Sequence, residues 1–133
     1  MLCHGSNKNI FVNNICLNNS NNSSYYADIN IYISPANVFF KNILSKKGLL
    51  IEGTELKHYN THEIEDKNTV NGKPIIYWKN RTSGNVPEGG GQVILANCTN
   101  VQLKDQYFTE SFYPILIAFT NSSKILDNYI SKP

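Results

Sequence analysis

Asn9-Ile-Phe-Val-Asn-Asn14 and Asn37-Val-Phe-Phe-Lys-Asn42 decide the fold, because they repeat one pattern with their starts 28 residues apart (9 to 37). In each stretch a short β-branched or aromatic run lies between asparagines. Related stretches recur at 100–105 and 123–128, and equally short apolar runs alternate with them at 29–34, 48–53, 91–96 and 114–119. No segment shows capped helical periodicity over ten or more residues. The sequence therefore predicts an all-β chain of short strands.

A repeat of about 20 to 30 residues built from short strands is typical of a solenoid. One coil cannot bury its apolar face alone, whereas stacked coils pair each strand with the strand one coil away and align inward Ile, Val, Leu and Phe in columns. Asparagine suits the corners, because it adopts left-handed dihedrals and forms amide ladders when stacked. Crossovers between parallel strands are nearly always right-handed. We predict a right-handed parallel β-helix of a few coils, with an antiparallel β-sandwich as the alternative.

One clear hairpin signal interrupts the repeat. Asn71-Gly72, flanked by strand-like residues 63–70 and 74–79, suits a tight type I′ turn. A glycine-rich return, 82–91, follows it. We expect residues 66–91 to form an excursion that projects from one coil. Residues 1–133 are expected to be a single β-helix domain, a fragment of a longer solenoid.

Composition and charge restrict the partners and the cellular location that we expect for the protein. A formal net charge of +2 is too small to indicate a nucleic-acid partner, and the longest apolar stretch, 113–119, is far shorter than the roughly 20 residues that span a bilayer. Three cysteines without metal-type spacing predict no disulfide framework. Glycosylation-type Asn-x-Ser/Thr patterns favour an extracytoplasmic, secreted or cell-surface location, although the first residues lack a signal-peptide core. These patterns begin at Asn18, Asn21, Asn22, Asn80, Asn97 and Asn121.

Residues 68–78 and 91–103 resemble the NosD-type β-helix family. The resemblance is carried by Asn68-Thr-Val-Asn-Gly-Lys-Pro-Ile-Ile-Tyr-Trp78 and by Gly91-Gln-Val-Ile-Leu-Ala-Asn-Cys-Thr-Asn-Val-Gln-Leu103. It is close over about residues 66–105 and looser elsewhere. It implies a right-handed parallel β-helix in an extracytoplasmic protein, and copper as the only cofactor suggested, since the family is described as periplasmic copper-binding. It implies little about function, because many relatives are surface or adhesin-like proteins.

A copper site would need clustered His, Cys or Met ligands. His58 and His62, four residues apart, are the best-placed candidates, but neither they nor the pair Cys3-His4 reach three ligands locally. We expect His58 and His62 to be exposed loop histidines and Cys98 to pack inward as a small apolar residue. No cofactor is predicted from the residues themselves.

Two carboxylates are candidates for a polysaccharide lyase or hydrolase. Glu63 and Glu65, two apart on a strand, share one face at roughly 6.8 Å. An inverting hydrolase separates its two carboxylates by roughly 6.5–9.5 Å. Solvated strand faces carry the same pattern, so no catalytic residue is predicted.

Exposed aromatic residues are the candidates for ligand binding. Tyr77 and Trp78 on the expected excursion, with Tyr59 and the loop residues Tyr25 and Tyr26, are predicted to form a platform for sugars. The alternative is that Trp78 folds back over the apolar side of a coil.

The predicted function is therefore that of a non-catalytic module of a secreted or cell-surface protein, acting in adhesion, carbohydrate or ligand binding, or scaffolding. The expected partners are a glycan or cell-surface component and further β-helix coils. The alternatives are a copper-handling accessory protein for metalloenzyme maturation and a polysaccharide lyase or hydrolase.

Overall fold

The computed structural model describes residues 1–18 and 27–131 and has an all-β architecture. Asn21, Asn22, Tyr25 and Tyr26 lie outside the described residues. The first half of the chain carries one helical segment, α1 (Lys57–Asn60), and the strands β1 (Leu2–His4), β2 (Ile10–Val12), β3 (Ile15–Cys16), β4 (Ile29–Tyr32), β5 (Val38–Phe40), β6 (Ile43–Leu44), β7 (Leu49–Glu52), β8 (Glu63–Ile64) and β9 (Thr69–Val70). The second half carries β10 (Lys73–Lys79), β11 (Gly84–Asn85), β12 (Gln92–Ala96), β13 (Val101–Lys104), β14 (Tyr107–Phe108), β15 (Ile115–Ala118), β16 (Lys124–Leu126) and β17 (Tyr129–Ile130).

Strands pair in parallel with strands one coil away, where a coil is one passage of the chain through the walls of a stack. In the N-terminal stack (β1–β9) the walls are β1-β4-β7, β2-β5-β8 and β3-β6-β9. The first two coils match residue for residue, as in the pairs Ile10↔Val38 and Ile15↔Ile43. The C-terminal stack (β10–β17) repeats this arrangement with β10-β12-β15, β11-β13-β16 and β14-β17. The prediction of an all-β chain with parallel strands is confirmed.

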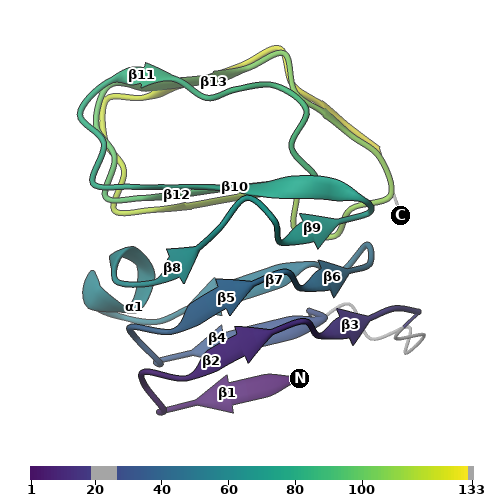
Figure 1. Ribbon diagram of the computed structural model, residues 1–133. Coiled ribbons are helices and arrows are strands. Elements are labelled where there is room, and N and C mark those ends of the chain that lie inside the picture. Colours follow the sequence, from purple (N-terminus) through teal and green to yellow (C-terminus); the bar gives the residue numbers. More distant parts are fainter. Residues whose placement is uncertain (19–26, 132–133) are drawn as a thin grey trace.

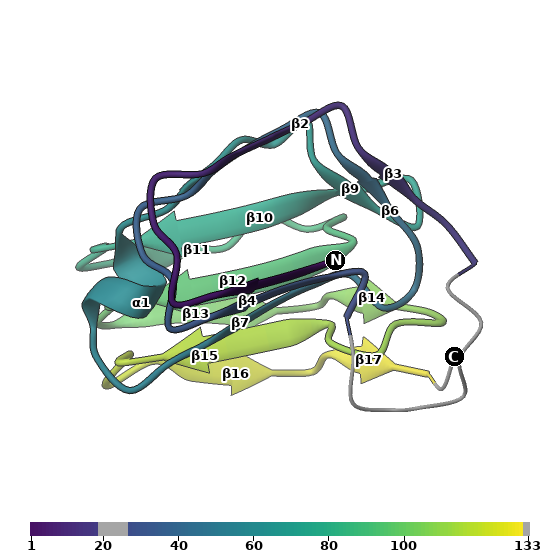
Figure 2. The ribbon, with the colours of Figure 1, turned by 90° about the horizontal axis from the view of Figure 1, so that it is seen from below.

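The two stacks share a wall. In Figure 1 the coils of the N-terminal stack lie above one another, whereas those of the C-terminal stack lie one behind another, so the stacking directions differ. One face of β10-β12-β15 packs on the N-terminal core through Ile75 and Ile94, and the opposite face packs on the C-terminal core through Val93 and Leu95. Seen from below, β10 and β12 lie across the outline of the N-terminal coils (Figure 2). This wall therefore covers the end of the N-terminal stack.

Residues 66–91 are not a projecting excursion, which corrects the sequence-based expectation. The hairpin itself is confirmed: β9 and β10 pair antiparallel, and Asn71 and Gly72 have φ values of 51° and 76°. Beyond the turn, however, β10 pairs in parallel with β12 and β11 pairs with β13. The physical reason is that apolar side chains occupy both faces of β10, which makes it a wall between two cores instead of a solvated hairpin.

Gln92 joins the stacks by capping an open strand edge. β7 is the last strand of its wall, so no strand of the described residues pairs with its outer backbone groups. The side-chain amide of the fully buried Gln92 forms hydrogen bonds with the backbone N–H and C=O of Leu49 in β7. Its Oε1 accepts from Leu49 N at 3.1 Å, and its Nε2 donates to Leu49 O at 2.7 Å. A side chain thus replaces the next strand at this edge.

Corner residues hold the coils in register through their side chains, as predicted for asparagine. Asn14, Asn42 and Asn68 form an amide ladder, with Nδ2 to Oδ1 distances of 2.9 and 2.8 Å. Several corner asparagines also adopt positive φ, among them Asn13 at 55° and Asn97 at 55°. The predicted left-handed corners and amide ladder are confirmed.

Candidate functional site

The three aromatic residues predicted to form a binding platform do not form one. Tyr77 and Trp78 are neighbours in β10 and point to opposite sides of the shared wall, Tyr77 against the N-terminal core and Trp78 against the C-terminal core. The Tyr77 hydroxyl donates to Tyr59 O at 2.5 Å, and burial raises the pKa of Tyr77 well above its usual range. Tyr59 in turn bonds the backbone of Gly53 at 2.8 Å. These partly buried side chains pack against the two cores instead of forming one exposed surface.

Trp78 covers the apolar side of a coil, which was the alternative interpretation of the sequence. Its ring is half-buried against the C-terminal core, and the Arg81 guanidinium lies 4.7 Å from the ring centroid. A Cβ on Gly84 would lie 3.2 Å from Trp78 Cη2, so a glycine leaves room for the indole.

His58 and His62 are buried, so the expectation that they are exposed loop histidines is wrong. His58 Nδ1 accepts from the backbone N–H groups of Thr54 and Glu55 at 3.1 and 3.0 Å. His62 Nδ1 accepts from Asn37 N at 3.2 Å, and its Nε2 lies 2.8 Å from His58 O. Because one ring nitrogen of His62 meets a donor and the other an acceptor, a neutral ring satisfies both. Burial lowers the pKa of His62, which favours the same neutral form.

His62 takes the place of an asparagine in a second ladder. Asn9 N donates to Asn37 Oδ1 at 2.9 Å, and in the next coil Asn37 N donates to His62 Nδ1 at 3.2 Å. The imidazole nitrogen thus performs the acceptor role that the amide oxygen performs one coil earlier. Among residues 1–18 and 27–131 no group of three or more His, Cys, Asp or Glu side chains is placed to hold a metal ion.

The remaining sequence candidates lie on the surface or in the cores. Glu63 and Glu65 are both exposed, and Glu63 forms an ion pair with Lys79 at 2.6 Å. Cys98 is fully buried in the C-terminal core, as expected, and its sulfur lies 3.5 Å from Trp78 O.

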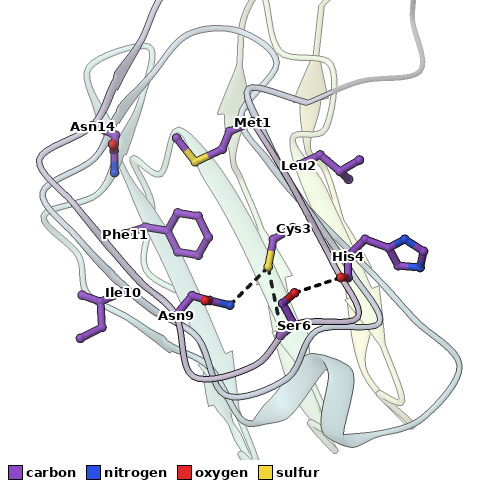
Figure 3. A pocket seen from close by; sticks show the side chains of 9 residues that line it. All are labelled: Met1, Leu2, Cys3, His4, Ser6, Asn9, Ile10, Phe11 and Asn14. Carbon is purple, nitrogen blue, oxygen red and sulfur yellow. Dashed lines mark hydrogen bonds between the residues drawn. The ribbon is translucent and has the colours of Figure 1, made fainter.

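An end face of the N-terminal stack carries a hollow that was not predicted as a site. It has a volume of about 640 Å³ and opens over the first coil, β1–β3 (Figure 3). Side chains and backbone edges of that coil surround it, with Cys3, Ser6 and Asn9 linked by hydrogen bonds on one side. Its full lining is Met1, Leu2, Cys3, His4, Ser6, Asn9, Ile10, Phe11 and Asn14.

A pair of exposed tyrosines is the second surface feature. Tyr107 in β14 and Tyr129 in β17 stack with ring centroids 4.6 Å apart and planes within 10°. Tyr107 is 57% exposed and Tyr129 is 52% exposed. The pair is aligned by the corner before it, where Gln106 N donates to Asn128 Oδ1 at 3.0 Å and Tyr129 N donates to Gln106 O at 2.9 Å. The chain thus presents a fixed aromatic surface that sequence reasoning missed, because both tyrosines lie in ordinary strands.

Comparison with protein-family models, with curated proteins and with solved structures finds no match to this chain. Within the described ranges, no helix has the length and apolar character needed to cross a membrane.

Proposed function

We propose that the chain is a right-handed parallel β-helix module of an extracytoplasmic protein, and that it acts without catalysis as a scaffold presenting a ligand-binding tyrosine pair. The in-register parallel strands and the corner ladders support the β-helix, and the strong preference for right-handed crossovers supports its hand. The resemblance of residues 66–105 to NosD-type proteins supports both the fold and the location.

The stacked pair Tyr107–Tyr129 carries the proposal of ligand binding. Aromatic rings held rigidly at a surface offer a flat apolar contact for the C–H face of a sugar at little cost in conformational entropy. Asp105 and Asp127, two residues before each tyrosine, lie at exposed corners with φ values of 53° and 52°. Their exposed carboxylates can accept hydrogen bonds from sugar hydroxyl groups, and that of Asp105 also lies 3.4 Å from Lys104 Nζ in an exposed ion pair. The ligand class that fits this surface is therefore a carbohydrate of a cell surface or matrix.

The chemistry-bearing candidates support a non-catalytic role. The Glu63 carboxylate is ion-paired with Lys79, and the Nδ1 atoms of both His58 and His62 accept backbone hydrogen bonds. A general acid or base must reach its substrate proton through a free position. The tyrosine pair, by contrast, lies open to solvent.

A glycan array with the purified chain tests the proposal. We expect binding that falls at least tenfold in the double variant Tyr107→Ala/Tyr129→Ala, and that survives in the matched control Tyr32→Ala, which removes another exposed tyrosine from the N-terminal stack. Equal binding by the double variant and the wild type contradicts the assignment. Release of reducing ends from a bound polysaccharide, abolished by Glu63→Gln, contradicts the non-catalytic role.

A further inference from the structure

The first and last coils have the same corner spacing. Positive φ occurs at Gly5, Lys8 and Asn13 in the first coil and at Phe119, Ser122 and Asp127 in the last, so the second and third corners follow the first by three and eight residues in both (5, 8, 13 and 119, 122, 127). Two of the coils between them, β4–β6 and β12–β14, repeat this spacing at Ile33, Ala36 and Lys41 and at Asn97, Asn100 and Asp105. Over these corners both stacks are therefore built on one cross-section.

Three corner positions follow one hydrogen-bonding rule in both stacks. The backbone N–H of one coil donates to the side-chain oxygen at the equivalent position of the next coil. In the N-terminal stack the pairs are Ser6 N to Ser34 Oγ at 3.0 Å, Asn9 N to Asn37 Oδ1 at 2.9 Å and Asn14 N to Asn42 Oδ1 at 3.1 Å. In the C-terminal stack they are Cys98 N to Thr120 Oγ1 at 3.1 Å, Val101 N to Ser123 Oγ at 3.2 Å and Gln106 N to Asn128 Oδ1 at 3.0 Å.

The rule leaves complementary groups at the two ends. In the last coil the N–H groups of Thr120, Ser123 and Asn128 donate to no acceptor among the described residues. In the first coil the equivalent side-chain oxygens are Ser6 Oγ, Asn9 Oδ1 and Asn14 Oδ1, and they accept no hydrogen bond from the part of the chain that the structure describes. Three donors thus face the direction in which three acceptors of the same spacing would continue the stack.

The apolar columns match in the same register. The inward positions of the last coil are Ile117, Ile125 and Ile130, which are 45%, 43% and 51% exposed because no coil lies beyond them in the structure. The equivalent positions of the first coil are Cys3, Phe11 and Cys16, which pack against the N-terminal core. Cys3 and Phe11 line the end face shown in Figure 3. Three branched side chains would therefore meet two small residues and one ring. Burying exposed apolar surface of this kind drives association.

We propose that the first coil of a second copy of this chain docks on the last coil, so that β1, β2 and β3 extend the walls that end in β15, β16 and β17. The contact joins two different surfaces, so it is head-to-tail and can repeat into an open chain of copies. It satisfies the strand edges that otherwise attract unspecific pairing. The proposal goes beyond the ligand role of the tyrosine pair and does not depend on it.

Sedimentation velocity over a concentration series tests this with two end-blocked variants. Asn9→Lys/Asn14→Lys places charges on the first coil, and Ile125→Lys/Ile130→Lys places them on the last coil. We expect the wild-type chain to form species above its 15.0 kDa mass, and each variant alone to stay monomeric. Each variant keeps one intact end, so a mixture of the two is expected to form a 1:1 dimer and to stop there. That dimer also demonstrates that both variants are folded.

Other outcomes overturn the proposal. A wild-type chain that remains monomeric at the highest concentration shows that the two ends do not bind each other. A last-coil variant that still dimerises alone shows a head-to-head contact between first coils. Failure of the mixture to dimerise, with both variants giving the wild-type β-sheet circular dichroism spectrum, also contradicts head-to-tail docking. The tyrosine substitutions are absent from both variants, so loss of docking and loss of glycan binding are separate results.

Discussion

Asn42→Ala should be far more destabilising than the same change at Asn14, although both residues belong to one ladder. Asn42 is 1% exposed and its amide makes four hydrogen bonds. Its Oδ1 accepts from N and Nδ2 of Asn14 at 3.1 and 2.9 Å, and its Nδ2 donates to Phe11 O and to Asn68 Oδ1 at 2.8 Å each. At a net value of about 1 kcal/mol for each bond, the loss is about 3–4 kcal/mol of the free energy of unfolding. Asn14 lies at the end of the ladder, and its side chain gives one of these bonds, so Asn14→Ala should cost about 1 kcal/mol.

Urea unfolding followed by circular dichroism measures both losses. An unchanged slope of free energy against urea concentration is expected for each variant, because the ladder does not alter the surface exposed on unfolding. The reasoning is refuted if the two variants lose equal stability, or if Asn42→Ala loses less than about 1 kcal/mol. Either result would mean that the buried amides do not hold the coils in register.

Three further predictions follow from single positions. Burial lowers the pKa of His62, so below about pH 6.5 the unfolded chain takes up a proton that the folded chain does not, and the folded state loses stability. For one proton this loss has a slope of at most about 1.4 kcal/mol per pH unit, and His62→Asn should reduce it. Parallel curves of stability against pH for the variant and the wild type would contradict this prediction. Phe119 has φ of 49° at the position equivalent to Asn97. Phe119→Asn should therefore raise the free energy of unfolding, measured by thermal melts, by about 1 kcal/mol. A decrease would show that the ring contact of Phe119 with Tyr59 outweighs the backbone strain. A Cβ at Gly91 would lie 2.2 Å from Val70 O, so Gly91→Ala should lower the free energy of unfolding by at least about 2 kcal/mol. The control Gly5→Asn should be tolerated, because the space around Gly5 is open and its φ is 59°. Equal stability of the two variants would refute the close approach at Gly91.

The parallel arrangement was predictable from local sequence, and its reason is physical. A corner that must adopt positive φ selects Asn or Gly, and the strand between two corners selects β-branched and aromatic residues. When coils are in register, these selections recur at one spacing, so the repeat from Asn9 to Asn37 contains the register directly. The structure pairs the strands within those two stretches residue for residue.

The division into two stacks was not predictable from the repeat. A hairpin at Asn71-Gly72 suggests a projection, and the turn residues alone do not say where the chain goes next. The informative signal was Ile75-Ile76-Tyr77-Trp78, a continuous apolar run in place of the alternation of a strand with one solvated face. Such a run indicates a strand buried on both sides. A run of four apolar residues also fits a segment of a buried helix, so the periodicity of the sequence could not distinguish a buried strand from a buried helix.

The candidate sites were misplaced for a related reason. The α1 segment lengthens the third coil, so the place of His62 in the ladder of Asn9 and Asn37 does not appear as a regular spacing. Tyr77 and Trp78 were assigned to a surface because the hairpin was assigned to one. The exposed pair Tyr107 and Tyr129 becomes visible only once β14 and β17 are known to be neighbours.

Nuclear Overhauser contacts in the isotopically labelled chain test most directly whether coils one repeat apart lie in register. Phe11 and Phe39 stack with centroids 4.8 Å apart, and Asn13 N donates to Phe40 O at 3.1 Å. The account predicts ring-to-ring contacts between Phe11 and Phe39 and amide-to-Hα contacts of the parallel type between β2 and β5. Strong Hα-to-Hα contacts between β2 and β5, as in an antiparallel pair, would contradict it. So would a spectrum without any contact between the two strands.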